Sequence, residues 1–371
     1  MTTRSFHLPA GTLTVEIARE DNQSPGAPIF GVSARLNPKR AFVFVSTVLG
    51  RHVPVSPAVM RTVHEALAGK ISRELPGPVL FVGMAETAVA LGAGVFDAYA
   101  RTTGRDDCLY LPSTRHPVSD RILARFTEDH SHATRHLIHI PAAVRSERLL
   151  RGCRTLVMVD DEMTTGRTFK NLEGAVRAAC PTVENVRHVV IKDWSGSSTN
   201  VVHSILAGRY RWDAFPDAPV VPDPNVDVTA RGDAPIVADE WGRQGITAAA
   251  TVPTVTGRPG RHLVLGTGEY VWPAYLHALG LERHLEAQGT GTVRFGATTR
   301  SPISVSGPVT SAFTFADNYG LGIPNHLYNV EPGDFEYITV FSETGSEHFD
   351  PAFVARFSPQ FIVPCADRAA L

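Results

Sequence analysis

The residues most suited to chemistry stand together at positions 155–168, in the string TLVMVDDEMTTGRT. An apolar run that ends at Val159 is typical of a buried parallel strand, and two carboxylates, Asp160 and Asp161, follow it directly. A turn of small and hydroxyl-bearing residues then leads into a helical segment from Phe169. Backbone N–H groups at a helix N-terminus bind phosphate, and neighbouring carboxylates suit sugar hydroxyls and Mg²⁺. The string therefore predicts a site for a phosphorylated sugar.

The same string resembles the donor-binding motif of type I phosphoribosyltransferases, which use 5-phosphoribosyl-1-pyrophosphate (PRPP) together with Mg²⁺. That motif is an apolar run, two acids, a short spacer and Thr-Gly-x-Thr. The resemblance implies that Asp160 and Asp161 are catalytic, hold the ribose hydroxyls and contact Mg²⁺, partly through PRPP. It also implies that a turn wraps the 5′-phosphate, and this turn consists of Thr164, Thr165, Gly166, Arg167 and Thr168. A chance strand, turn and helix with these residue types is the alternative.

One position of this motif bears on the acceptor. Purine-salvage members of the family often carry an aspartate where this chain has Thr164. The threonine therefore favours the orotate-like branch over a hypoxanthine- or guanine-type mechanism.

A second strand and glycine turn precede this motif. Residues 78–82 are expected to form a short buried strand, and residues 88–100 a helix. In the resembled family the turn between them binds the pyrophosphate of PRPP, and here it consists of Gly83, Met84, Ala85, Glu86 and Thr87. A carboxylate is unfavourable beside a pyrophosphate, so we expect Glu86 to cap the helix or to meet Mg²⁺ or the acceptor.

A polar stretch follows the next expected strand, residues 108–111. It begins Ser-Thr-Arg-His, and its lack of periodicity suggests the mobile loop that type I enzymes close over the reacting centre. Orotate-like enzymes often use a lysine in this loop, and the resemblance implies Arg115 as its catalytic substitute for the pyrophosphate charge. The histidines between 116 and 139 would be solvated, contact the base or bind a metal, although His130 and His132 lack helical spacing and a cysteine partner.

Three further side chains are candidates for contact with the acceptor. His52 lies in a basic string before an expected helix at 57–70, a place that belongs to the hood over the acceptor base in orotate-like members; a solvated loop is the alternative. His116 lies in the expected lid. Trp194 follows an expected strand at 186–191, where an aromatic ring can stack on the base, and a core tryptophan is the alternative. Residues 200–208 are then expected to form a helix.

The C-terminal part of the chain repeats some of this order. An expected strand, a glycine turn with Glu269, a helix, a strand and the string Thr-Thr-Arg-Ser-Pro follow one another. Glu269 and Arg300 stand 31 positions apart, against 29 for Glu86 and Arg115. We infer a partial internal repeat without a second Asp-Asp motif, in which Glu269, Arg300 and Ser301 bind another anion or complete the first site. Convergence of two common strand–turn–helix units is the alternative.

The Thr-Arg-Ser-Pro string at 299–302, joined to this kind of transferase domain, resembles the TRSP domain. That domain accompanies phosphoribosyltransferase domains in proteins of bacterial tellurium-resistance and stress-response gene clusters. The resemblance implies the synthesis of a nucleotide-like metabolite with partner enzymes, and it does not imply contact with tellurium.

The composition is that of an ordinary globular protein, with 43% hydrophobic and 19% charged residues and a formal net charge of −2. This balance gives no bulk attraction to nucleic acid or to a membrane surface. No apolar run approaches the roughly 20 residues of a membrane span, and the first residues lack the pattern of a signal peptide. The four cysteines have no CxxC spacing, which favours reduced thiols in a cytoplasmic protein.

Together these features predict a doubly wound α/β fold, with a mainly parallel sheet of the type I phosphoribosyltransferase kind, a hood and a second, smaller α/β domain. The predicted parts are a transferase domain at 1–212, a Pro-rich linker at 213–260 and a TRSP-like domain at 261–371. The predicted reaction transfers the phosphoribosyl group of PRPP to an unidentified, nucleobase-like small molecule, with release of pyrophosphate. A non-catalytic PRPP sensor is the alternative. The resemblance also implies a homodimer.

Overall fold

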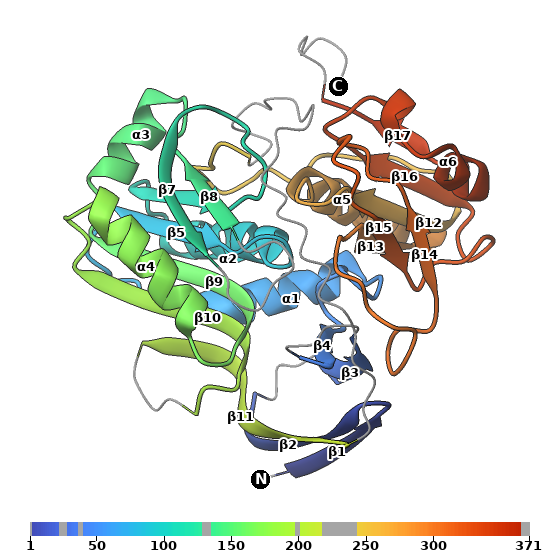
Figure 1. Ribbon diagram of the computed structural model, residues 1–371. Coiled ribbons are helices and arrows are strands. Elements are labelled where there is room, and N and C mark those ends of the chain that lie inside the picture. The colour runs from blue at the N-terminus through green and yellow to red at the C-terminus, as the bar shows by residue number, and fades with distance from the viewer. Residues whose placement is uncertain are drawn as a thin grey trace.

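The computed structural model of this chain describes residues 2–21, 28–35, 40–127, 135–196, 201–216 and 243–364. Figure 1 shows two α/β bodies side by side, one formed mainly by the first half of the chain and one by the C-terminal part. Each body is built around a sheet of its own.

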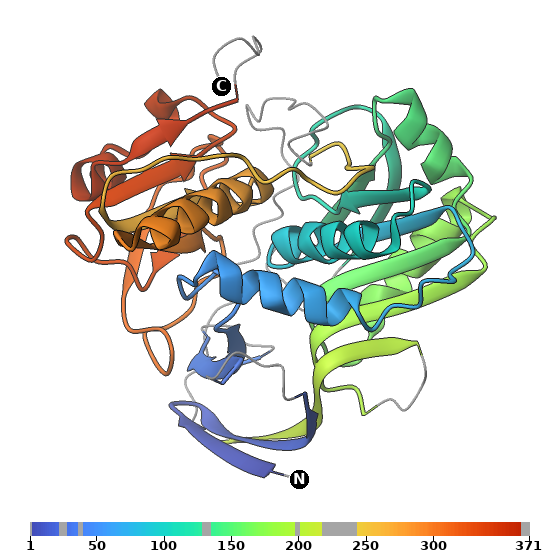
Figure 2. The same cartoon turned by 180° about the vertical axis from the view of Figure 1, so that it is seen from behind.

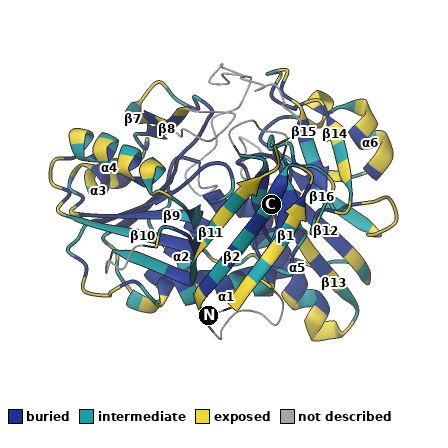
Figure 3. Cartoon of the chain, turned by 60° about the horizontal axis from the view of Figure 1, so that its bottom comes forward, coloured by how far each residue is buried: buried dark blue, intermediate teal, exposed yellow. Residues whose placement is uncertain are grey.

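The larger sheet has seven strands in the order β1-β2-β11-β10-β9-β5-β6. Its strands are β1 (Thr2–Leu8), β2 (Gly11–Glu20), β11 (Val202–Ala214), β10 (Asn185–Asp193), β9 (Thr155–Met163), β5 (Val79–Gly83) and β6 (Cys108–Pro112). The five strands from β11 to β6 run parallel, whereas β2 pairs antiparallel with both β1 and β11. The central strands are continuous apolar runs, as expected of parallel strands that are covered on both faces. Figure 3 shows β1 as the exposed outer edge.

Helices cover both faces of this sheet, so the doubly wound α/β fold is confirmed. Two helices, α1 (Pro57–Ala68) and α2 (Val89–Thr103), lie on the face turned to the viewer in Figure 2. Two others, α3 (Val144–Arg151) and α4 (Arg167–Ala179), lie on the opposite face, which Figure 1 shows in front. Two antiparallel hairpins flank the sheet, namely β3 (Phe30–Ala34) with β4 (Phe42–Ser46), and β7 (Ile122–Thr127) with β8 (Arg135–His139).

Two expectations about local structure are corrected here. The helix expected at 200–208 is wrong, because residues 202–208 belong to β11, whose neighbours are β10 and the N-terminal β2. The stretch expected to be an irregular lid contains the β7–β8 hairpin instead. His130 and His132 lie outside the described residues.

The smaller sheet has four parallel strands in the order β13-β12-β16-β17. Its strands are β12 (Gly260–Gly266), β13 (Gly291–Ala297), β16 (Tyr337–Phe341) and β17 (Gln360–Ile362). The remaining elements of this part are α5 (Trp272–Gln288), the short 3-10 helix η2 (Ser346–His348), α6 (Pro351–Phe357), and a hairpin of β14 (Ala312–Phe315) and β15 (Asn325–Tyr328). No helix in the described part of the chain is long and apolar enough to cross a membrane.

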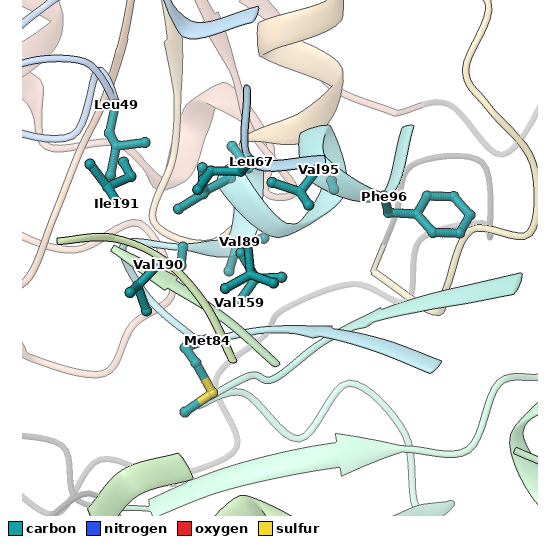
Figure 4. Packing of buried hydrophobic residues seen from close by; sticks show 14 of the residues in the cluster. Leu49, Leu67, Met84, Val89, Val95, Phe96, Val159, Val190 and Ile191 are labelled. Atoms are coloured by element: carbon teal, nitrogen blue, oxygen red, sulfur yellow. The ribbon is translucent and has the colours of Figure 1, made fainter. Parts of the chain in front are cut away.

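One hydrophobic cluster extends through both bodies, and a second cluster, which includes Leu263 and Phe353, lies within the smaller body. Side chains of β5, β9, β10, α1 and α2 pack together in the cluster shown in Figure 4, which includes Met84, Val89 and Val159. The same cluster continues into α5 and β13 of the smaller body. The end of the expected linker also packs onto the larger sheet, since Ile246 forms an antiparallel bridge with Tyr110 of β6.

Candidate active site

A cavity of about 190 Å³ opens at the carboxyl ends of β5 and β9, where the larger sheet, the β3–β4 hairpin and the smaller body meet. Most of the residues singled out in the sequence line it, although they come from distant parts of the chain. The predicted residues in its lining are His52, Met84, Ala85, Glu86, Thr87, Arg115, Asp160, Asp161, Thr164, Thr165, Gly166, Arg167, Thr168, Arg300 and Ser301. Polar loops gather here because the carboxyl ends of parallel strands meet at one edge of the sheet.

The turn at 164–168 presents a helix N-terminus to the cavity. Gly166 precedes the first residue of α4 and has a φ of 70°, a left-handed conformation that glycine adopts without strain. It carries no side chain that could cap the helix. The N–H of Arg167 donates to the hydroxyl of Thr165 at 3.4 Å, and the helix N-terminus, whose first residues line the cavity, suits an anion. Arg167 begins the helix and lines the same cavity.

The two aspartates belong to the end of β9, which continues to Met163 rather than ending at Val159. Asp161 accepts a hydrogen bond of 3.1 Å from Nζ of Lys192, a lysine of β10 that is completely buried. Burial raises the pKa of Asp161, and the ammonium of Lys192 opposes this increase. Asp160 accepts a bond of 2.8 Å from the N–H of Asp161. Lys192 thus holds one carboxylate in place from beneath.

The turn at 83–87 is held against the start of the expected lid. Gly83 ends β5 behind the cavity, and a Cβ there would lie 2.7 Å from the hydroxyl of Tyr110, so the close packing requires glycine. The N–H of Ala85 donates to Oγ of Ser113 at 2.8 Å. The peptide bond between Ala85 and Glu86 is cis.

Glu86 does not cap a helix, so one of the roles expected for it is wrong. The cap position of α2 is Ala88, and the carboxylate of Glu86 is surrounded by arginines. It lies 3.1 Å from Arg51, 3.5 Å from Arg115 and 3.7 Å from Arg300. The negative charge of the turn is therefore offset, which leaves the cavity edge suitable for an anion.

Glu269 and His116 do not line the cavity, but each contacts a residue that does, namely Arg115 and Arg300 respectively. The carboxylate of Glu269 accepts hydrogen bonds from the N–H of Arg115 at 2.9 Å, from Arg243 at 2.8 Å and from the hydroxyl of Thr114. Burial alone would raise the pKa of Glu269, but His116 and the guanidinium groups of Arg243 and Arg300 hold it below its ordinary value.

The two candidate histidines are both neutral. Burial, reinforced by nearby arginines, lowers the pKa of His116 to about 3, and burial with Arg51 does the same for His52. Nε2 of His116 lies 3.3 Å from the guanidinium of Arg300 and accepts its hydrogen bond. His52 lines the cavity, and its buried Nε2 has no hydrogen-bond partner among the described residues.

Trp194 packs in the core, the alternative noted for it above. Its ring stacks on Phe44 with centroids 4.7 Å apart and meets Phe30 edge-on at 5.4 Å. It is not among the lining residues, whereas Phe44 of β4 is. Of these three packed rings, the one that lines the cavity is therefore Phe44 of the hairpin.

Sequence reasoning missed several lining residues, above all those of the β3–β4 hairpin. They are Arg35, Arg40, Val43 and Phe44 from the hairpin, with Glu162, Met163, Phe169 and Thr299 from elsewhere. Arg40 donates to Glu162 at 2.9 Å, and its guanidinium lies over the ring of Phe42 at 4.7 Å. In the sequence, the signal for this part of the cavity was a basic residue on each side of the aromatic, β-branched run at 42–49, namely Arg40 and Arg51. The contact of Arg40 with Glu162 joins positions more than a hundred residues apart, so no local pattern predicts it.

No group of three or more histidine, cysteine or acidic side chains in the described part of the chain is arranged to hold a metal ion. The two carboxylates of Asp160 and Asp161 nevertheless line the cavity and supply the oxygen ligands that Mg²⁺ prefers. They fit an ion that takes its other ligands from a bound phosphate or from water.

Comparison with known families follows the division into two bodies. A family model described as phosphoribosyl transferase matches residues 29–211, and the model of the TRSP domain, which lies C-terminal to that transferase domain, matches residues 242–355. None of the curated proteins matches this sequence.

Solved structures of phosphoribosyltransferases align with part of the chain. Adenine phosphoribosyltransferase from Rhodothermus marinus is 18% identical, with 52% of this chain and 93% of that chain covered and a TM-score of 0.30. The Trypanosoma brucei enzyme, solved with AMP, pyrophosphate and ribose-5-phosphate, is 12% identical over 56% of this chain and 87% of its own, with a TM-score of 0.33. A hypoxanthine phosphoribosyltransferase from Staphylococcus aureus is 9% identical over 43% and 77%, with a TM-score of 0.27.

Proposed function

We propose that this chain, which belongs to the family that joins a phosphoribosyl transferase domain to a TRSP domain, transfers the 5-phosphoribosyl group of PRPP to a small acceptor and releases pyrophosphate. The observation that carries this proposal is the cavity itself. Adjacent carboxylates, a helix N-terminus and a second glycine turn, from two neighbouring parallel strands, line one cavity of about 190 Å³. Ribose hydroxyls, a 5′-phosphate and a pyrophosphate need these three kinds of partner.

In the proposed complex the residues orient the donor more than they react with it. Asp160 and Asp161 hold the ribose, and the turn at 164–168 fixes the far end through the 5′-phosphate. The bond between C1 of the ribose and the pyrophosphate oxygen breaks, and the oxygen keeps the electron pair. The acceptor's nucleophilic ring atom bonds to C1, and the proton of that atom passes to solvent water. The ribose ring gains positive charge in this step, and Arg115 stabilises the negative charge of the departing group.

Mg²⁺ bound with PRPP would neutralise part of the pyrophosphate charge. Asp160 and Asp161 are the residues that would contact it, alongside oxygens of the donor itself. The same two side chains would therefore contact both the ribose and the metal ion.

The acceptor is proposed to enter beneath the β3–β4 hairpin, where Phe44 and His52 line the cavity. Because the pKa of His52 is lowered to about 3, this residue is neutral at physiological pH and suits a hydrogen bond better than strong general base catalysis. A flat, heteroaromatic acceptor fits this combination, in agreement with the nucleobase-like class expected from the sequence.

The test is release of pyrophosphate from Mg·PRPP in the presence of a panel of nucleobases and related heteroaromatic acids. We expect acceptor-dependent release, and a loss of at least about a hundredfold in Asp160→Asn and Asp161→Asn, since each removes a charged contact to ribose. Asp106→Asn, at an exposed aspartate far from the cavity lining, is the matched control and should behave as wild type. Tight PRPP binding without release for any acceptor would favour the non-catalytic sensor.

A further inference from the structure

The two bodies are built on one plan. The strands β10-β9-β5-β6 of the larger sheet and β17-β16-β12-β13 of the smaller one have the same order and are all parallel. Along the chain each body runs strand, helix, strand, hairpin, strand, helix, strand, with α3 as an addition in the first. This is more than the partial repeat expected from the sequence, because it extends to the hairpins, the third and fourth strands and the second helix.

Individual hydrogen bonds recur at equivalent positions. The N–H of Ser113 donates to the carbonyl of Gly83 at 2.8 Å, and that of Thr298 donates to the carbonyl of Gly266 at 3.0 Å. The hydroxyl of Ser113 then accepts from the amide two positions after Gly83 at 2.8 Å, and the hydroxyl of Thr298 accepts from the amide two positions after Gly266 at 3.0 Å. Two unrelated strand–turn–helix units would share the strand order but not this set of bonds.

The same register makes four charged residues equivalent in pairs. Glu86 and Glu269 each stand three positions after the glycine that ends the central strand. Arg115 and Arg300 each stand three positions after the residue that pairs with that glycine. The carboxylates lie between the arginines: Arg115 is 3.5 Å from Glu86, and Arg300 is 3.7 Å from both Glu86 and Glu269. The two copies thus meet through their equivalent turns.

In the second copy, the carboxylate equivalent to Asp161 is hydrogen-bonded to other side chains of the protein. Ser342 and Glu343 follow β16 where Asp160 and Asp161 follow the paired part of β9. The carboxylate of Glu343 accepts from Arg243 at 2.9 Å and from the hydroxyl of Tyr319 at 2.7 Å.

The phosphate turn of the second copy is lost as well. Gly345 begins the stretch that replaces it, and the side chain of Asp350 caps α6 at the end where a phosphate would otherwise bind. A carboxylate at this helix N-terminus satisfies the N–H groups and repels an anion. Among the described residues of this copy, neither the paired aspartates nor the uncapped helix N-terminus of the first copy is present.

We infer that the C-terminal domain is a second copy of the transferase core that has lost its own donor site and now completes the first, with Arg300 binding the pyrophosphate end of the donor. This inference rests on the proposed function. The Arg300 side chain lines the cavity although it is only 9% exposed. Its Nη2 donates to His116, whereas its buried Nη1 has no hydrogen-bond partner among the described residues. A guanidinium that lines the cavity and keeps hydrogen-bonding capacity beyond its protein partners is suited to an anionic oxygen.

Binding of donor fragments tests the role of Arg300. Calorimetric titration should give a dissociation constant for Mg·pyrophosphate that is at least about tenfold weaker in Arg300→Ala, whereas ribose 5-phosphate should bind within about twofold of wild type. Arg300→Lys should recover part of the loss, because the charge is kept and the planar fork is not. Arg356→Ala, at a half-exposed arginine of the same domain that pairs with Glu331, is the control.

The outcomes separate this inference from the proposed function. If wild type binds PRPP and releases pyrophosphate, but Arg300→Ala binds Mg·pyrophosphate as wild type does, the inference is wrong and the function stands. If wild type binds neither PRPP nor pyrophosphate, the proposed function fails first. A parallel loss of ribose 5-phosphate binding in Arg300→Ala would point to general damage and would also overturn the specific role.

Stoichiometry and mixing test the loss of the second site. Titration of wild type with Mg·PRPP should give one site per chain, and Asp161→Asn should abolish it whereas Ser342→Ala should not. A mixture of Asp161→Asn and Arg300→Ala chains should be no more active than the average of the two separate variants, because both residues act on a site within one chain. Two sites per chain, or recovery of activity on mixing, would contradict the inference.

Discussion

Four histidines with strongly lowered pKa values, of which His52, His64 and His116 are buried and His277 is partly buried, make the stability of the folded protein depend on pH. Burial lowers the pKa of His52, His64 and His116 to about 3 and that of His277 to about 4. Above pH 6.5 each is neutral in both the folded and the unfolded chain. Between pH 6.5 and the folded values the unfolded chain takes up protons that the folded chain does not, so the free energy of unfolding falls as the pH falls.

His64 allows this effect to be measured away from the cavity. It lies in α1, its ring is 5.3 Å from that of Tyr275, and its Nε2 has no hydrogen-bond partner in the described part of the chain. His64→Leu should therefore reduce the loss of stability between pH 6 and pH 4 by about 1.4 kcal/mol per pH unit, the contribution of one proton. Urea unfolding at several pH values measures it. An unchanged slope in the variant would show that His64 is protonated in the folded protein.

At the scale of elements, α5 holds the start of α1. Ser56 does not cap α1 with its own side chain but donates its hydroxyl to Glu282 of α5 at 2.6 Å. The other carboxylate oxygen of Glu282 accepts from the N–H of Ala58 at 2.8 Å. A side chain from the C-terminal domain thus serves as the helix cap of the first.

Glu282→Ala should lower the free energy of unfolding by about 1–2 kcal/mol, since it removes a cap and leaves an N–H group unsatisfied at a partly buried place. Glu286→Ala removes an exposed carboxylate one turn further along the same helix and should change stability by less than about 0.5 kcal/mol. Chemical denaturation of the two variants side by side gives the comparison. Equal stabilities would mean that water replaces the cap without cost.

Elements that are specified locally were predictable from the sequence. The central strands are unbroken apolar runs, and each carries its polar residues just beyond its end, so both the strands and the two turns of the cavity follow from short strings. β11 was mistaken for a helix because its short apolar run, near Ile205, fits either period. It is a strand because it pairs with β2 near the N-terminus, and a partner so distant in the sequence leaves no local pattern.

The missed parts of the cavity have the same physical origin. Lys192 and Arg40 reach Asp161 and Glu162 across strands and hairpins, and only the tertiary structure brings these charges together. Trp194 and Phe44 stack on one another, so only the packed structure shows which ring reaches the cavity. Arg300 was found because the internal repeat places it by analogy with Arg115, which is a long-range signal that the sequence does contain.

At the scale of the whole molecule, one core joins the two bodies. Val55, between the hood and α1, forms an antiparallel bridge with Phe295 of β13. Arg51 donates to the carbonyl of Glu86 at 2.7 Å and to the carbonyls of Gly268 and Thr298 at 2.6 Å, so it ties the equivalent turns of both copies. A hydrophobic cluster and buried hydrogen bonds across the boundary predict a single cooperative unfolding transition rather than one for each body.

Gly50 lies at a close contact between the two bodies, and its substitution tests the prediction of a single unfolding transition. It has a φ of 71°, and an added Cβ would lie 2.5 Å from the ring of Phe295 in the other body. Gly320 has the same φ of 71° but nothing within 4 Å of an added Cβ. Gly50→Ala and Gly320→Ala share the strain of a left-handed alanine, of about 1 kcal/mol, and only Gly50→Ala also pushes the two bodies apart.

Differential scanning calorimetry should therefore give one transition for wild type and both variants, with calorimetric and van't Hoff enthalpies equal. The Tm of Gly50→Ala should fall by several degrees more than that of Gly320→Ala, because overpacking at the joint adds about 1–3 kcal/mol. The whole transition should move, since the core that would be disturbed belongs to both bodies. Two resolved transitions, of which only one moves in Gly50→Ala, would instead show that the C-terminal domain unfolds independently of the transferase domain it completes.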